Sequence, residues 1–131
     1  MAPTGQPVVS AVDAFDLPDW LGDGDVTWTA TASVHGGHLV PGELSGGGTP
    51  FACDLLGADE AFPRPVLDDG WRRQAHQAWA HGQVLLVDYD GRLTLTVPGT
   101  SFTADRALEA IGRLAKAVGV KPGRFVAALR L

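Results

Sequence analysis

The sequence predicts a single α+β domain: a mostly antiparallel sheet with two helices packed on one face. Three observations support this prediction. Apolar and polar residues alternate in several short stretches, apolar residues recur with helical spacing in two longer ones, and glycine-containing turns join neighbouring strand-like segments. The predicted order is β-β-β-α-β-β-α-β. Hairpins outnumber crossovers in this order, so antiparallel pairing should dominate.

The first three predicted strands form a meander. Over residues 26–34, Val, Trp and Ala alternate with Thr and Ser, so one face packs and the other is rich in hydroxyls. A Gly-Gly pair then turns the chain into a return strand over residues 39–44, in which Pro41 marks an edge or a bulge. Three consecutive glycines lead into a third strand over residues 51–56.

A helix and a hairpin follow. Asp68 or Asp69 caps a helix that runs to about His81, in which apolar residues recur at i, i+4, i+7 and i+8 from Trp71. Residues 83–89 and 92–97 then flank Asp90-Gly91, a pair typical of the two-residue turn in which both central residues have positive φ. That turn sets the register of the hairpin and thereby which side chains share each face.

The second helix and a last strand complete the order. Thr103 caps this helix, Asp105 lies favourably near its positive end, and Gly119 ends it. Its expected buried stripe consists of Leu108, Ile111, Leu114, Ala115 and Val118. Residues 124–131 form the final strand, with Phe125, Ala127, Leu129 and Leu131 on one face.

The N-terminal end carries weaker signals. Residues 1–9 hold two prolines and a glycine without apolar periodicity, so we expect a flexible tail there and a single domain over residues 10–131. Ser10-Ala11-Val12-Asp13 has the spacing of a capping box with Asp in place of Glu, which indicates a short helical turn before Pro18.

Composition excludes several classes of protein. The chain has 131 residues, 45% of them hydrophobic and 19% charged, with a formal net charge of −5. This acidic balance, with Arg72-Arg73 as the one adjacent basic pair, argues against nucleic-acid binding, which needs clustered cations. The apolar run 84–87 is too short to cross a bilayer, so we expect no membrane association.

Localisation and source follow from composition in the same way. The chain lacks the basic start and apolar stretch of a secretory signal, and its single cysteine, Cys53, excludes an intramolecular disulfide. We therefore expect a cytoplasmic protein, with Cys53 as a small buried hydrophobe. The preference for Arg over Lys and the absence of Asn indicate a G+C-rich, bacterial genome.

Two groups of residues are candidate binding sites. His35 and His38 flank the Gly-Gly turn, and two imidazoles brought together there could ligate zinc, copper or nickel in a metal-binding protein or small enzyme. A third ligand is not evident, so no cofactor is predicted. The other alternative is a small-molecule ligand in a pocket lined by Trp28, Trp71 and Trp79.

The leading hypothesis is a non-catalytic interaction module that forms a homodimer. If both helices cover one face of the sheet, the second face of the Asp90-Gly91 hairpin is left without cover. A two-fold axis would bury that face between two copies of the chain. The expected interface residues are Leu85, Val87, Tyr89, Thr94 and Thr96.

Overall fold

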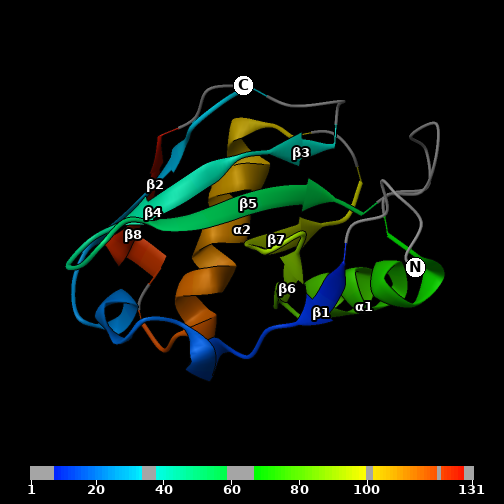
Figure 1. Cartoon of the computed structure of the whole chain (residues 1–131), viewed down its shortest axis with the longest axis horizontal. Helices are drawn as coiled ribbons and strands as arrows, with labels where there is room; N and C mark the ends of the chain where they lie inside the picture. Colours follow the sequence, from blue (N-terminus) through cyan, green and yellow to red (C-terminus); the bar gives the residue numbers. More distant parts are fainter. Residues whose placement is uncertain (1–7, 34–37, 59–66, 100–101, 121, 129–131) are drawn as a thin grey trace.

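The computed structural model describes residues 8–33, 38–58, 67–99, 102–120 and 122–128. Within them lie two α-helices, α1 (Asp69–Ala80) and α2 (Ala104–Ala117) (Figure 1). The Asp68 carboxylate accepts a hydrogen bond from the Trp71 amide, and the Thr103 hydroxyl oxygen accepts one from the Arg106 amide. Both helices therefore begin at caps that the sequence predicts. Three short 3-10 helices are η1 (Ala14–Asp16), η2 (Asp19–Gly22) and η3 (Pro122–Arg124).

Eight strands in the described part of the chain form one mixed sheet, which confirms the α+β class. They are β1 (Val9–Ala11), β2 (Val26–Ala30), β3 (Leu39–Val40), β4 (Gly42–Ser45), β5 (Phe51–Gly57), β6 (Leu85–Tyr89), β7 (Arg92–Val97) and β8 (Phe125–Ala128). Their spatial order is β1-β6-β7-β5-β4-β2-β8, with β3 also paired to β5. Among the described strands, two pairings, β5 with β7 and β2 with β8, are parallel. The others are antiparallel, so the sheet is mostly but not purely antiparallel.

The two parallel pairings arise from the two helices. The chain leaves β5, passes through α1 and β6, and returns in β7 beside β5. It then crosses through α2 to the opposite end of the sheet, where β8 pairs with β2 (Figure 1). A helical crossover is the usual way to connect parallel strands, because a tight hairpin can only join antiparallel ones.

The N-terminal segment differs from the prediction. Val9, which was expected in a tail, begins β1, and β1 pairs antiparallel with β6 at one edge of the sheet. The expected helical turn occurs later, as η1, where the carboxylate of Asp13 rather than Ser10 provides the cap by accepting from the Phe15 amide at 3.0 Å. Residues 1–7 of the predicted tail lie outside the described residues.

The β6–β7 hairpin has the predicted turn. Asp90 and Gly91 have φ angles of 56° and 85°, and Tyr89 pairs with Arg92 across the turn. The Asp88 carboxylate accepts a hydrogen bond of 2.8 Å from the Gly91 amide, which adds a side-chain contact to the turn. The two-residue turn therefore sets which side chains of β6 and β7 point to each face.

The larger of two cores lies between the sheet and α2. Buried side chains of β2, β4, β5, β6 and β7 meet one face of this helix. The helix contributes Ala107, Ala110, Ile111, Leu114 and Ala115. Leu108, which the sequence places in the buried stripe, is 46% exposed. Leu108 lies at the edge of the buried stripe, on the side of the helix surface that leaves the contact with the sheet.

A smaller core lies on the opposite face of the sheet, beneath α1. Ala75 is buried there with Leu56, Ala58 and Leu67, and Trp71, Leu85 and Tyr89 pack against them. Successive residues of a strand point to opposite faces, and Leu55 and Leu56 accordingly belong to different cores. The prediction that both helices pack on one face is therefore wrong. Apolar periodicity shows that a helix has a buried side but not which face of the sheet receives it.

The end of α1 nevertheless reaches α2 through one arginine. The Arg113 guanidinium lies 3.7 Å from the centroid of the Trp79 ring and donates hydrogen bonds to the carbonyl oxygens of Trp79 and Gln83 at 2.6 and 3.0 Å. It also pairs with Glu109 at 2.8 Å. These contacts link the C-terminal end of α1 to the side of α2 that faces β6.

A break between β3 and β4 brings the backbone against a buried tryptophan. Pro41 lies between the two strands, and its carbonyl accepts from the Thr31 amide at 2.9 Å. Both strands pair with β5 in one continuous register and β4 lies between β5 and β2, so Pro41 marks neither of the predicted features, a bulge or an edge. The next residue, Gly42, lies against the Trp28 indole so closely that a Cβ atom would be 2.5 Å from the ring. Trp28 is fully buried, and its Nε1 donates to the Cys53 carbonyl at 2.7 Å.

Candidate functional site

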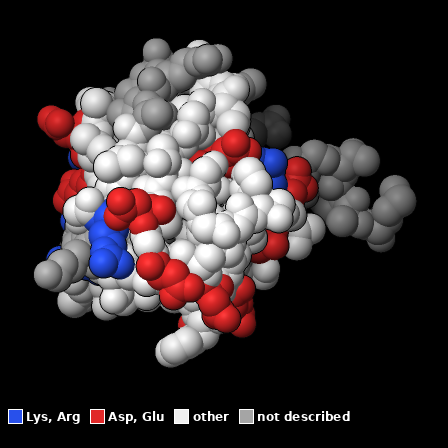
Figure 2. Space-filling view, turned by 90° about the vertical axis from the view of Figure 1, so that its left-hand side faces the viewer, with Lys and Arg blue, Asp and Glu red and all other residues white. Residues whose placement is uncertain are grey.

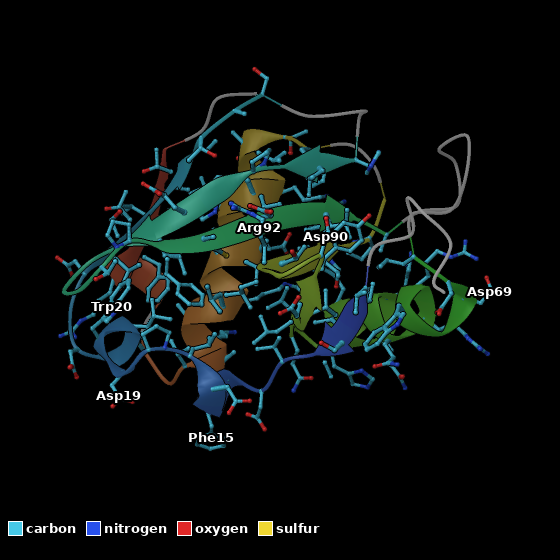
Figure 3. The ribbon with its side chains drawn as sticks, in the orientation of Figure 1. Phe15, Asp19, Trp20, Asp69, Asp90 and Arg92 are labelled. Carbon is cyan, nitrogen blue, oxygen red and sulfur yellow. The ribbon has the colours of Figure 1, made fainter. Side chains whose placement is uncertain are left out.

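On the outer face of the sheet, a buried carboxylate pairs with a half-exposed arginine. Asp54 lies between Cys53 and Leu55 on β5, so its side chain points away from the α2 core and toward the outer face, where Arg92 begins β7 (Figure 3). Arg92 Nε donates to Asp54 Oδ2 at 2.8 Å and Nη2 donates to Oδ1 at 3.0 Å. The side chain of Asp54 is 5% exposed, whereas that of Arg92 is 46% exposed.

The same carboxylate also holds the backbone where β4 begins. Gly42 donates its amide hydrogen to Asp54 Oδ1 at 3.1 Å, and the Gly42 carbonyl accepts from Arg92 Nη2 at 3.4 Å. The hydrogen bonds with Asp54 raise the pKa of Arg92 above its usual value. Both Asp54 oxygens accept from protein groups, so the arrangement suits a structural clamp between β4, β5 and β7 better than proton transfer to a substrate.

Cys53 is inert in this setting, in agreement with the sequence. Its side chain is fully buried, and burial, with a smaller contribution from Asp54, raises the pKa of the thiol far above its ordinary value of 9.0. A nucleophilic cysteine needs a lowered pKa and access to a substrate. Cys53 has neither of these properties.

This buried thiol predicts a loss of stability at alkaline pH. Above pH 9 the unfolded chain loses the thiol proton while the folded chain keeps it, so each further pH unit lowers the free energy of unfolding by up to about 1.4 kcal/mol. Tyr89, whose pKa is raised by burial and then by Asp90, adds to the loss above pH 10. Urea unfolding from pH 8 to pH 10 measures how steeply the free energy of unfolding falls with pH. A Cys53→Ala variant should lose most of this pH dependence, and an unchanged dependence in that variant would show that Cys53 is not its source.

The candidate metal site falls partly outside the described residues. His35 is among those not described, and His38 immediately precedes β3, where its carbonyl accepts from the Gly57 amide at 2.7 Å. Within the described ranges, no three His, Cys, Asp or Glu side chains lie close enough together to hold a metal ion. The structure therefore leaves the His35 and His38 pair as a prediction from sequence.

The three tryptophans of the candidate ligand pocket do not share one core, although Trp79 packs against the same core as Trp28. Trp28 is buried in the α2 core, and Trp71 packs in the α1 core on the other face of the sheet. Trp79 lies at the end of α1 between Arg113 and Arg106, whose guanidinium is 5.6 Å from the ring centroid. The sheet separates Trp28 from Trp71, so the three rings do not line one pocket.

The expected dimer interface is covered within the chain itself. Val87, Thr94 and Thr96 are fully buried, and Leu85 and Tyr89 pack in the core beneath α1. The buried threonines use their hydroxyls internally, since Thr94 donates to the Arg92 carbonyl and Thr96 to the Leu85 carbonyl. The expectation that the second face of the β6–β7 hairpin is uncovered is wrong, because α1 packs on that face and β1 pairs with β6 beside it.

Among the described helices, neither packs on the outer face of the sheet at β8, because α1 lies over β5 and β6 and α2 lies on the inner face. β8 lies at the far end of the strand order, and within the described chain it pairs with one neighbour, β2. Its buried residue Phe125 faces α2, whereas Val126 points outward and is 53% exposed beside Thr27. The alternation that predicts Phe125 and Ala127 on the inner face also places Val126 outside. The sequence did not show that β8 would be an edge strand.

The side of the molecule that bears β8 carries both uncharged and charged residues. Figure 2 shows uncharged residues over much of this side, interrupted by a basic group and several acidic side chains, with further acidic side chains toward its lower edge. The exposed aspartates of the η1 and η2 region, Asp13, Asp16, Asp19, Asp23 and Asp25, account for much of the local negative charge. Near them Phe15 is 94% exposed and points away from the body, while Trp20 lies against the turn formed by residues 46–48 (Figure 3).

Comparison with known proteins identifies no relative. No family model matches the chain, and no curated protein or solved structure has a significant match to it. Among the described helices, none is long and apolar enough to cross a membrane.

Proposed function

We propose that this chain is a non-catalytic interaction module that forms a homodimer through the β8 edge of its sheet. The observation that carries the proposal is the end position of β8 in the sheet, with Val126 53% exposed beside it. An edge strand presents unpaired backbone amides and carbonyls, which readily pair with another strand. Pairing there joins two sheets with little rearrangement of either copy.

The surroundings of β8 support this assignment. Val126 lies exposed on the outer face of the strand, and α2, which packs against its inner face, carries the exposed apolar side chain of Leu108. A strand added at this edge would therefore find an apolar contact at Val126. Strand addition of this kind draws affinity from main-chain hydrogen bonds and specificity from the flanking side chains.

The opposite edge of the sheet is a weaker candidate. β1 has three residues, and Val8, which precedes it, is 72% exposed. The Val8 carbonyl already accepts a hydrogen bond of 2.9 Å from the Asp90 amide. Its shorter length leaves fewer backbone groups for pairing than β8 offers, although the same exposed valine makes it a suitable control.

Sedimentation velocity of the wild type and two matched variants tests the proposal. We expect the wild type to be a dimer at micromolar concentration and Val126→Asp to be a folded monomer, because two carboxylates would meet near the two-fold axis. Val8→Asp places the same charge at the opposite edge and should remain a dimer. A monomeric wild type, or equal dissociation by both variants, would overturn the proposal. Circular dichroism checks that each variant folds.

A further inference from the structure

The exposed flank of α2 carries a pattern that fits a second copy of itself. Asp105, Leu108, Gly112 and Lys116 follow one another at spacings of three, four and four residues. At about 100° per residue these four positions fall within roughly 80° of the helix circumference. They form one stripe, which we call the α2 stripe. Asp105, Leu108 and Lys116 are exposed, and Gly112 is partly exposed.

Leu108 lies on the flank of α2 away from its arginines, whereas Asp105 and Lys116 lie nearer the side of the helix that faces away from the sheet. Arg106 and Arg113 lie on the opposite flank of α2. Their guanidiniums donate hydrogen bonds to the Pro98 carbonyl and to the Trp79 carbonyl at the end of α1. Leu108 is about 150° around the helix from these arginines. Figure 1 shows β8 on one side of α2 and β6 with α1 on the other, so the flank away from the arginines faces the β8 edge. A copy joined at β8 would approach this flank.

The stripe is self-complementary under a two-fold axis. The two-fold axis of antiparallel β8 pairing runs perpendicular to the sheet, so a helix that packs flat on the sheet, as α2 would, is set antiparallel to its copy. With the axis level with Ala110, Leu108 of one copy lies opposite Gly112 of the other, where the missing side chain leaves room for it. Asp105 then lies opposite Lys116, and the centres of the two pairs differ by half a residue, or about 0.8 Å of helix rise.

We propose that the α2 stripe selects a second copy of this chain as the partner at the β8 edge and fixes an antiparallel, two-fold arrangement. This inference rests on the proposed function, because it assumes that copies meet at β8. A symmetric contact buries the same patch on both copies and closes as a dimer, whereas a head-to-tail contact could continue into a fibre. The Asp105 and Lys116 contacts distinguish these two arrangements, since opposite charges meet twice in the symmetric one.

Reversing one charge at a time tests the pairing of Asp105 with Lys116. In Asp105→Lys, lysine would meet lysine twice, and in Lys116→Asp, aspartate would meet aspartate twice. Each homodimer should dissociate about tenfold more readily at low ionic strength, since two exposed pairs are lost and become repulsive. In an equimolar mixture of the two variants both contacts are attractive again. Native mass spectrometry should then show the heterodimer well above its statistical half.

The mixture separates pairing between copies from effects within one helix. Asp105 and Lys116 also interact favourably with the helix dipole, so each reversal lowers helix stability slightly. That effect would be the same with either partner and would not enrich the heterodimer. The double variant Asp105→Lys, Lys116→Asp should recover the homodimer, and the exposed pair Asp19→Lys and Arg73→Asp should mix statistically.

The possible failures are distinguishable. A monomeric wild type would overturn the proposed function and this inference with it. A wild-type dimer that Val126→Asp dissociates, but in which the charge-reversed variants mix statistically, would leave the β8 edge in place and overturn the α2 stripe alone. If β8 pairs instead with a strand of another protein, native mass spectrometry would show a complex whose mass is not twice that of the chain, and this result would also overturn the inference.

Discussion

A Gly42→Ala variant is expected to lose about 3 kcal/mol of unfolding free energy, the upper part of the range for overpacking in a core. The added methyl would be 2.5 Å from the Trp28 ring. That ring has no room to retreat, because it is fully buried and its Nε1 is hydrogen bonded to the Cys53 carbonyl. Any shift of Gly42 would in turn lengthen its amide hydrogen bond to Asp54. Urea unfolding monitored by tryptophan fluorescence measures the loss.

Gly24→Ala is the matched control for this change. A Cβ atom at Gly24 meets nothing within 4 Å, so the same substitution should be neutral or stabilise the fold by up to about 1 kcal/mol through the unfolded chain. The two variants should thus change stability in opposite directions. A Gly42→Ala protein as stable as the wild type would show that Trp28 is not held in this position.

Removal of the Asp54 carboxylate is expected to cost about 3 kcal/mol, near the lower end for breaking a buried ion pair because Arg92 is half exposed. Asp54→Ala leaves the Gly42 amide without its acceptor and removes both hydrogen bonds from Arg92. The strands β4, β5 and β7 would lose their common polar contact. Denaturant unfolding again gives the magnitude.

Two further variants resolve this loss into its parts. Asp54→Asn keeps an oxygen for the Gly42 amide but loses the charge, so it should be less destabilising than Asp54→Ala. Asp88→Ala removes an exposed carboxylate that accepts one backbone hydrogen bond at the hairpin turn, and it should cost about 1 kcal/mol. An Asp54→Ala loss no larger than that of Asp88→Ala would mean that the ion pair adds nothing beyond one hydrogen bond.

Local signals predicted most of the secondary structure. The caps at Asp68 and Thr103 and the Asp90-Gly91 turn all depend on residues within a few positions of each other. Such features form from backbone geometry and short-range hydrogen bonds, so they can be read from the chain. The β1 strand was not predicted, because three residues hold too little periodicity and its pairing with β6 depends on contacts far along the chain.

The candidate sites were predicted less well, because they depend on contacts between segments far apart in the chain. Leu85, Val87 and Tyr89 were expected at an interface because their alternation marks a second apolar face, and that face exists. Its cover is α1 of the same chain rather than a second copy. The exposed position of Val126 depends on β8 reaching the end of the sheet, which no local pattern of residues 124–131 indicates.

The sequence by itself determined the α+β class, the two helices and the hairpin register, because these depend on periodicity and turn chemistry within short segments. Tertiary structure decided which face each helix covers and which strands lie at the edges of the sheet. The residues of a helix with one apolar stripe do not indicate on which face of a sheet the helix packs. The choice is made by the partners it meets, Leu56 and Leu85 for α1 and the inner side chains of β2 to β7 for α2.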